Sequence, residues 1–145
     1  MARSLGFEVE LPLAYAAAKT AVREALKAEG FGVLTEIDLQ AAFKEKLGQE
    51  FRPYVILGAC NPPLAFAAVT ADPSVGLLLP CNATVEARDA GHSIVRLADP
   101  QAMLATAVAE LSPSVREVAA DAHQRMQRVA TALRSRSDQQ PASSS

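Results

Sequence analysis

The sequence predicts one α+β domain whose elements follow the order β-α-β-α-β-α-β-β-α-α. Two observations carry this prediction. Short segments in which apolar and polar residues alternate, as in half-buried strands, are separated by segments in which apolar residues recur at helical spacing. Of the 145 residues 50% are hydrophobic, and 29 of these are alanine, which favours closely packed helices. We expect the domain to span residues 1–136 and the polar segment 137–145 to be a disordered tail.

The composition excludes several classes of function. The chain has 14 Lys and Arg against 16 Asp and Glu, a formal net charge of −2. It therefore lacks the excess positive charge that binds nucleic acids or acidic membranes. Its longest apolar runs fall far short of the roughly 20 residues that cross a bilayer. The N-terminal residues lack the apolar core of a signal peptide. We expect a cytoplasmic protein with no nucleic-acid or membrane partner.

The first half of the chain reads as three strand–helix units. Strands are expected at residues 5–11, 31–37 and 54–57, the first two from alternation and the third from a short continuous apolar run. A helix follows each strand, and residues suited to helix termini mark its ends. These residues are Pro12 and Gly30 for the first helix, Asp38 and Gly48 for the second, and Asn61, Pro62 and about Thr70 for the third.

A hairpin is expected next. Its first strand spans residues 77–85, its turn residues 88–91 and its second strand residues 93–98. Pro80 donates no ladder hydrogen bond, which suggests a sheet edge or a bulge. The residues expected to share one face of the first strand are Leu77, Leu79, Cys81, Ala83 and Val85.

Two helices complete the domain. A short helix is expected at residues 100–108, and Ser112 and Pro113 suit the N-cap and first position of the longest helix. Its apolar residues recur every three or four positions, as in an amphipathic helix. They are Val115, Val118, Ala122, Met126, Val129 and Leu133.

The two cysteines are the leading candidates for chemistry. Each is followed by asparagine, in the pairs Cys60-Asn61 and Cys81-Asn82, and the expected strands could bring the two thiols together. A cytoplasmic pair is seldom a structural disulfide. It can be a redox couple, or two thiolate ligands of a soft metal such as Cu(I) or Zn(II).

The position of Cys60 beside an expected helix N-terminus adds to this candidate. Asn61 and Pro62 suit the N-cap and first helical residue, and the partial positive charge there lowers a thiol pKa or binds an anion. The alternative is structural: Asn61 only caps the helix, and both thiols are small buried apolar groups. Cys81 alternates in phase with leucine and valine, which favours this alternative.

Other polar residues are weaker candidates. Glu36, Asp38 and Arg52 flank strand ends, where surface ion pairs and a helix cap explain them. His92 and His123 have no potential ligand at metal-binding spacing. The common hydrolase, nucleotide and dinucleotide motifs do not occur in the sequence.

Several motifs resemble the bacterial and archaeal domain of unknown function family 302. The most specific are Gly-Ala-Cys-Asn-Pro-Pro at residues 58–63 and Leu-Pro-Cys-Asn at residues 79–82. The run at residues 31–38 and the dipeptide Asp99-Pro100 also match, and the resemblance covers roughly residues 4–135.

The resemblance implies a fold and an assembly, but no reaction. It implies an antiparallel sheet with helices packed on one face, and a homodimer. The family has no established enzymatic activity, so no catalytic residue is transferred. Its motifs include Cys60, Asn61, Pro62, Pro80 and Cys81. Relatives often carry a histidine near position 66, which is Phe66 here. That difference argues against a three-ligand zinc site, and leaves a two-thiolate Cu(I) site open.

These observations lead to one functional hypothesis and two alternatives. The hypothesis is a small homodimeric binding protein for a soft metal, copper or zinc, or for a small anionic ligand. The expected ligand-binding residues are Cys60, Asn61, Pro62, Cys81 and Asn82, with Cys60 and Cys81 as the metal ligands. The alternatives are a thiol-dependent redox enzyme, in which one cysteine reacts and the other resolves it, and a structural dimerisation or scaffold domain.

Overall fold

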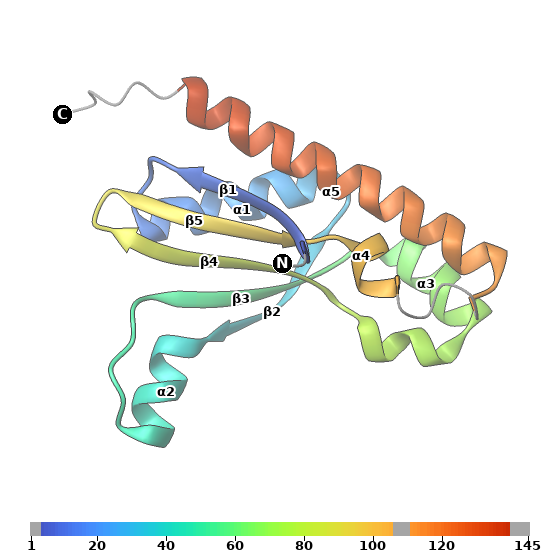
Figure 1. Cartoon of the computed structure of the whole chain (residues 1–145), viewed down its shortest axis with the longest axis horizontal. Helices are drawn as coiled ribbons and strands as arrows, with labels where there is room; N and C mark the ends of the chain where they lie inside the picture. The colour runs from blue at the N-terminus through green and yellow to red at the C-terminus, as the bar shows by residue number, and fades with distance from the viewer. Residues whose placement is uncertain (1–3, 106–110, 140–145) are drawn as a thin grey trace.

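An antiparallel sheet of five strands organises the molecule (Figure 1). The structure is a computed structural model and describes residues 4–105 and 111–139. The elements in chain order are β1 (Gly6–Leu11), α1 (Tyr15–Ala28), β2 (Gly32–Asp38), α2 (Leu39–Leu47), β3 (Tyr54–Cys60), α3 (Pro62–Ala71), the 3-10 helix η1 (Pro73–Leu78), β4 (Cys81–Asp89), β5 (His92–Ala98), α4 (Pro100–Leu104) and α5 (Pro113–Gln139). The predicted α+β class and the predicted order of strands and α-helices are confirmed.

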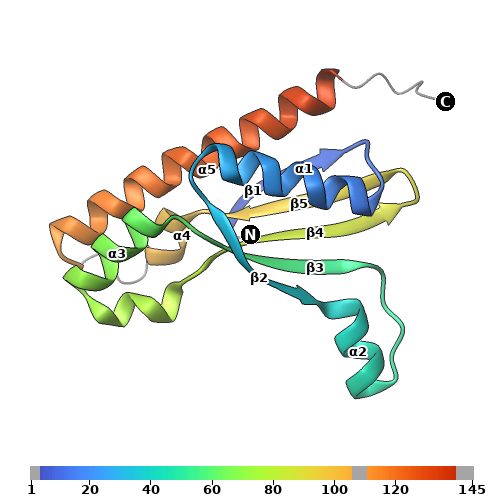
Figure 2. The same ribbon diagram turned by 180° about the vertical axis from the view of Figure 1, so that it is seen from behind.

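The sheet has the strand order β1-β5-β4-β3-β2, and all neighbouring strands are antiparallel. The register aligns Val9, Val95, Val85 and Val55 in one row across four strands. All four are buried, because the alternating pattern of each strand places them on the same face. Helices α1 and α5 lie across this face, as Figure 2 shows. The expected sheet with helices on one face is confirmed.

Alanine allows α1 and the C-terminal half of α5 to approach each other and the sheet. Ala18 and Ala21 of α1 and Ala130 of α5 are fully buried. Larger side chains of the same buried cluster are also inaccessible to solvent, among them Leu26 and Met126. In a closely packed core, the loss of even one methylene group lowers the stability of the protein.

The opposite face of the sheet carries a ladder of ion pairs. The Nε atom of Arg96 lies 2.9 Å from Glu8, and the guanidinium of Arg96 also pairs with Glu86. Arg52 Nε lies 2.5 Å from the other carboxylate oxygen of Glu86. Burial would raise the pKa of Glu86, but hydrogen bonds from Arg96 and Arg52 outweigh it and lower the pKa. This carboxylate is therefore charged at neutral pH, and its two ion pairs stabilise this face of the sheet.

Helix α2 projects from the β2–β3 end of the sheet (Figure 1). All nine of its described residues are at least partly exposed. Asp38 caps its N-terminus by accepting a hydrogen bond from the Ala41 N–H, and Gly48 ends it in the left-handed conformation, as predicted. Phe43 packs edge-on against Phe51, with the ring centroids 5.3 Å apart.

The first strand of the hairpin begins later than predicted. Residues 77 and 78 belong to η1, the Leu79–Pro80 peptide bond is cis, and β4 starts at Cys81. The prediction of a strand from residue 77 is therefore wrong. Its physical reason is the Asp72 side chain, which accepts hydrogen bonds from both the N–H and the hydroxyl of Ser74 and begins a 3-10 helix. The apolar run that follows has no periodicity that separates a strand from a helix.

The helices after the hairpin begin as predicted. Asp99 caps α4, and the Ser112 hydroxyl accepts a hydrogen bond from the Val115 N–H at the start of α5. Helix α4 ends at Leu104, and residues 106–108 of the predicted helix lie outside the described residues. Helix α5 continues to Gln139, and residues 140–145 of the predicted tail also lie outside. None of the helices in the described part of the chain has the length and hydrophobicity that crossing a membrane requires.

Candidate functional site

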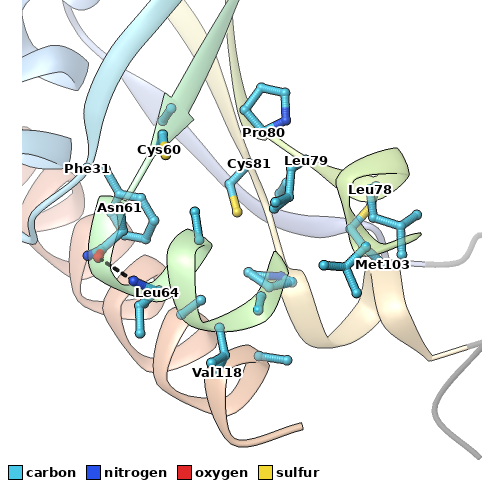
Figure 3. Close-up of a pocket in the computed structure, with 18 of the residues that line it drawn as sticks. Phe31, Cys60, Asn61, Leu64, Leu78, Leu79, Pro80, Cys81, Met103 and Val118 are labelled. Carbon is cyan, nitrogen blue, oxygen red and sulfur yellow. Dashed lines mark hydrogen bonds between the residues drawn. The ribbon is translucent and has the colours of Figure 1, made fainter. Parts of the chain in front are cut away.

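A cavity of about 380 Å³ lies where β3 ends and β4 begins. Its walls come from these strand ends and from α3, η1, α4 and the N-terminal half of α5 (Figure 3). Ligand pockets in proteins typically measure about 300–1,000 Å³, and an apolar cavity of about 150 Å³ already binds benzene. The volume is therefore sufficient for a small organic molecule.

The wall of the cavity is almost entirely apolar. Among the described residues, all those that line it are uncharged. Most are leucine, valine, alanine and proline, with Phe31 and Met103. The polar exceptions are the two thiols, two asparagines and Thr35. Such a wall favours an apolar ligand and gives an ion nothing to pair with.

Both cysteines line this cavity. Cys60 ends β3 and Cys81 begins β4, where the register pairs Cys81 with Ala59, the neighbour of Cys60 (Figure 3). Both are free, partly buried thiols. Burial, and to a lesser extent the neighbouring Cys60, raises the pKa of Cys81 to about 11. The Cys81 thiol is therefore neutral at physiological pH, which makes it a poor nucleophile.

The Asn-Pro-Pro motif closes the N-terminus of α3. Pro62 and Pro63 occupy the first two helical positions and have no N–H. The Asn61 side chain accepts from the Leu64 N–H at 3.3 Å, and the Asn61 carbonyl accepts from the Ala65 N–H at 2.9 Å. Within the described helix no N–H of the first turn is left for a ligand. The geometry gives the anionic ligand of the sequence hypothesis no support.

Asn61 also joins three helices behind the cavity. Its amide nitrogen donates to the carbonyl of Glu29, which follows α1, at 3.3 Å. Arg125 of α5 donates to the same carbonyl at 3.1 Å. Gly30 has a φ of +86°, and a Cβ there would lie 2.8 Å from the Asn61 amide nitrogen. The predicted capping role of Asn61 is confirmed. Its amide oxygen caps α3, and its amide nitrogen binds the segment that follows α1.

Thr35 and Asn82 form a polar rim at one edge of the cavity. The register places them on either side of Gly58, in β2 and β4 respectively, and both side chains are exposed. A Cβ at Gly58 would collide with the Thr35 hydroxyl oxygen and lie 3.0 Å from Pro80 Cγ. Glycine is therefore required here for the rim residues and Pro80 to approach β3.

The family model described as "Domain of unknown function DUF302" matches residues 7–133. The chain belongs to this family. The resemblance inferred from its motifs is thereby confirmed. The DUF302 chain is also similar to a solved structure described as an uncharacterized conserved DUF302 protein from Bacillus stearothermophilus. The sequence identity is 27%, the TM-score is 0.78, and the match covers 90% of this chain and 99% of the other. A search of curated proteins finds no match.

Phe66 does not line the cavity of this DUF302 protein. Phe66 lies on the outer side of α3 and is 76% exposed. Within the described residues no group of three or more His, Cys, Asp or Glu side chains could hold a metal ion. A metal bound at Cys60 and Cys81 would therefore have two protein ligands from the part of the DUF302 chain that the structure describes.

The weaker polar candidates have the structural roles expected of them. Glu36 pairs with Arg23 and Lys19, whose hydrogen bonds lower its pKa. Asp38 caps α2, and Arg52 pairs with Glu86.

The two histidines each pair with one carboxylate. His92 Nδ1 lies 2.8 Å from Asp89, at the hairpin turn. His123 Nδ1 lies 2.8 Å from Asp99, the N-cap of α4. The first pair stabilises the hairpin turn, and the second joins α5 to the N-terminus of α4.

The sequence did not single out most residues of this DUF302 cavity. Leu34 and Thr35 were expected only as parts of a strand, and Met103 belongs to a short helix. Ala119 and Ala122 of α5 line the cavity, and of these two only Ala122 belongs to the predicted apolar stripe. One signal was available: between Arg52 and Glu86 the sequence contains a single charged residue, Asp72.

Proposed function

We propose that this DUF302 protein binds a small, mainly apolar molecule in the cavity between β3, β4, α3 and α5. One observation carries the proposal: a cavity of about 380 Å³ whose described wall is uncharged and mostly apolar. Removing apolar ligand surface from water into such a wall is favourable by about 25 cal/mol per Å².

The apolar residues at the mouth of the cavity support this proposal. Leu34 and Met103 line it and are 69% and 39% exposed, and Leu78 is 36% exposed. Helix α3 is apolar around most of its circumference, but Ala68 is its single buried residue within the described chain. Clustered exposed apolar residues in soluble proteins mark binding surfaces more often than chance would give.

A matched pair of variants on α3 tests the proposal. Ala65 lines the cavity, and Ala67 on the same helix is exposed and outside it. The neutral fluorescent probe N-phenyl-1-naphthylamine should bind the wild type with saturable enhancement at one probe per chain. Ala65→Leu fills part of the cavity and should weaken the probe's affinity about tenfold, whereas Ala67→Leu should not. Absence of saturable binding, or equal affinities in the two variants, would contradict the proposal.

A soft metal at the two thiols is a second candidate. It is favoured by the position of Cys60 and Cys81 in one wall, close enough for Cys60 to raise the pKa of Cys81. Two thiolates suit two-coordinate Cu(I), while zinc requires further ligands. Because the metal must displace the Cys81 proton, its affinity should rise with pH. A reducing compartment such as the cytoplasm would keep both thiols available.

Elemental analysis distinguishes this candidate from the first. The wild type, loaded with Cu(I) under anaerobic conditions, should retain about one copper per chain through desalting. The double variant Cys60→Ser/Cys81→Ser should retain none, yet still bind the naphthylamine probe. Equal copper contents in the two proteins would exclude thiolate ligation.

Fewer observations support the remaining hypotheses, a redox enzyme and a homodimeric scaffold. A thiol-dependent redox enzyme needs a thiolate at neutral pH, and the raised pKa of Cys81 opposes that role for this residue. The homodimer stays a proposal, supported by the apolar side chains exposed on β2, of which Ile37 is 48% accessible. Sedimentation analysis tests it: a monomer at micromolar concentration would exclude the dimer and, with it, the scaffold hypothesis.

A further inference from the structure

We infer that the ligand is an uncharged amphiphile, whose apolar body fills the cavity and whose single neutral hydrogen-bonding group meets the rim formed by Thr35 and Asn82. This inference rests on the proposed function, and it names the class of ligand for the same site. Alcohols, ketones and primary amides with an apolar body belong to this class, and carboxylates and amines that are ionised at neutral pH do not.

The described wall offers an ionised head group no opposite charge. An ion moved from water into an apolar cavity loses its hydration, and this loss is offset only by a paired charge or several hydrogen bonds. Between residues 53 and 85, which supply most of the wall near the strand ends, the one charged residue is Asp72. Its carboxylate is engaged by Ser74 at the start of η1 and does not line the cavity.

The α3 N-terminus, which otherwise would favour a carboxylate, is closed to it. Helix N-termini bind anions through free N–H groups. In α3 the first two N–H groups are replaced by proline rings, and the next two are bonded to Asn61. The partial charge of the helix therefore has no donor in its first turn through which to hold an anion.

The rim offers hydrogen bonds of the right kind. The Thr35 hydroxyl and the Asn82 amide can each donate and accept, so together they suit a neutral group and do not select for either sign of charge. Within residues 4–105 and 111–139 neither side chain has a protein hydrogen-bond partner. Gly58, between them, has no side chain, and the Thr35 hydroxyl and Pro80 approach β3 at this point. Within the described wall, the rim therefore offers a ligand hydrogen-bonding groups that no protein atom uses.

Three eight-carbon probes separate this class from its charged relatives. 1-Octanol, octanoate and octylammonium share the apolar body and differ in the head group. At pH 7 each competes with N-phenyl-1-naphthylamine for the wild-type protein. 1-Octanol should displace the naphthylamine at a concentration at least tenfold lower than either ion. Equal or better displacement by an ion would overturn the inference and leave the proposed function standing. No saturable naphthylamine binding would overturn both.

A double variant tests the role of the rim. Thr35→Val with Asn82→Leu removes the polar atoms and keeps the approximate shapes of the side chains. The affinity of this variant for 1-octanol should be about fivefold weaker, because one or two hydrogen bonds are lost. Its affinity for naphthylamine should be unchanged. Retained naphthylamine binding shows that the variant is folded. An unchanged affinity for 1-octanol in that variant would overturn the assignment of the head group to this rim.

Discussion

The two halves of helix α5 face different surroundings. In the C-terminal half Met126, Val129 and Leu133 have at most 1% of their surface exposed and press against α1 and the sheet. In the N-terminal half Val118, Ala119 and Ala122 follow the same helical periodicity but border a cavity. One continuous apolar stripe therefore serves two purposes, depending on whether a sheet face or a set of short helices lies opposite. Amphipathicity alone does not reveal whether a helix face fills a core or lines a binding site.

The largest expected contrast is between two methionines. Met126 is fully buried between the sheet and α1, whereas Met103 is 39% exposed at the cavity. Met126→Ala should lower the free energy of unfolding by about 3 kcal/mol, because it leaves a void in a packed core. Met103→Ala should lower it by less than about 1 kcal/mol. Urea denaturation measures both, and equal losses would mean that the two ends of the molecule are packed alike.

Two asparagines extend the comparison, with smaller expected losses in the free energy of unfolding. Asn61 caps α3 and joins it to α1, so Asn61→Ala should lower the free energy of unfolding by about 1–2 kcal/mol. Asn82 is exposed at the rim. Asn82→Ala should therefore change the free energy of unfolding by no more than about 0.5 kcal/mol. The same denaturation experiments apply. A larger loss for Asn82→Ala than for Asn61→Ala would reverse the assigned roles.

A third expected effect is a pH dependence that originates in the cavity wall. The pKa of Cys81 is raised from 9.0 to about 11, so the folded protein holds this proton more tightly than the unfolded chain does. The resulting stabilisation is complete below about pH 9 and is lost as the pH rises towards 11. The wild type should therefore lose stability faster than Cys81→Ser over this interval in pH-dependent urea denaturation. Parallel curves would show that the thiol is not buried in solution.

The predictions from sequence succeeded where local pattern determines structure. The alternation in β1, the Asp38 and Gly48 ends of α2 and the Ser112 cap of α5 depend on neighbours in the sequence, and all were predicted. The strand from residue 77 failed because three consecutive leucines carry no period. Here the side-chain hydrogen bonds of Asp72 decided the local structure.

The candidate site was predicted in part for the same reason. Cys60 and Cys81 stood out through their motifs and do share a wall. The cavity itself forms from segments more than 80 residues apart in the chain, such as Thr35 and Ala119, whose meeting depends on the tertiary fold. The closed α3 N-terminus, by contrast, follows from two consecutive prolines and was open to inference from the sequence.

Helix α2 has a practical consequence for anyone who wishes to modify this protein. It begins and ends in well-formed caps, and each of its nine residues reaches solvent. Segments with exposed backbone and few buried contacts tolerate insertions best. A fluorescent reporter or an affinity tag inserted between Gly48 and Glu50 would stand outside the core and away from the residues that line the cavity. The molecule thus offers an attachment point through which its ligand could be followed without altering the walls that hold it.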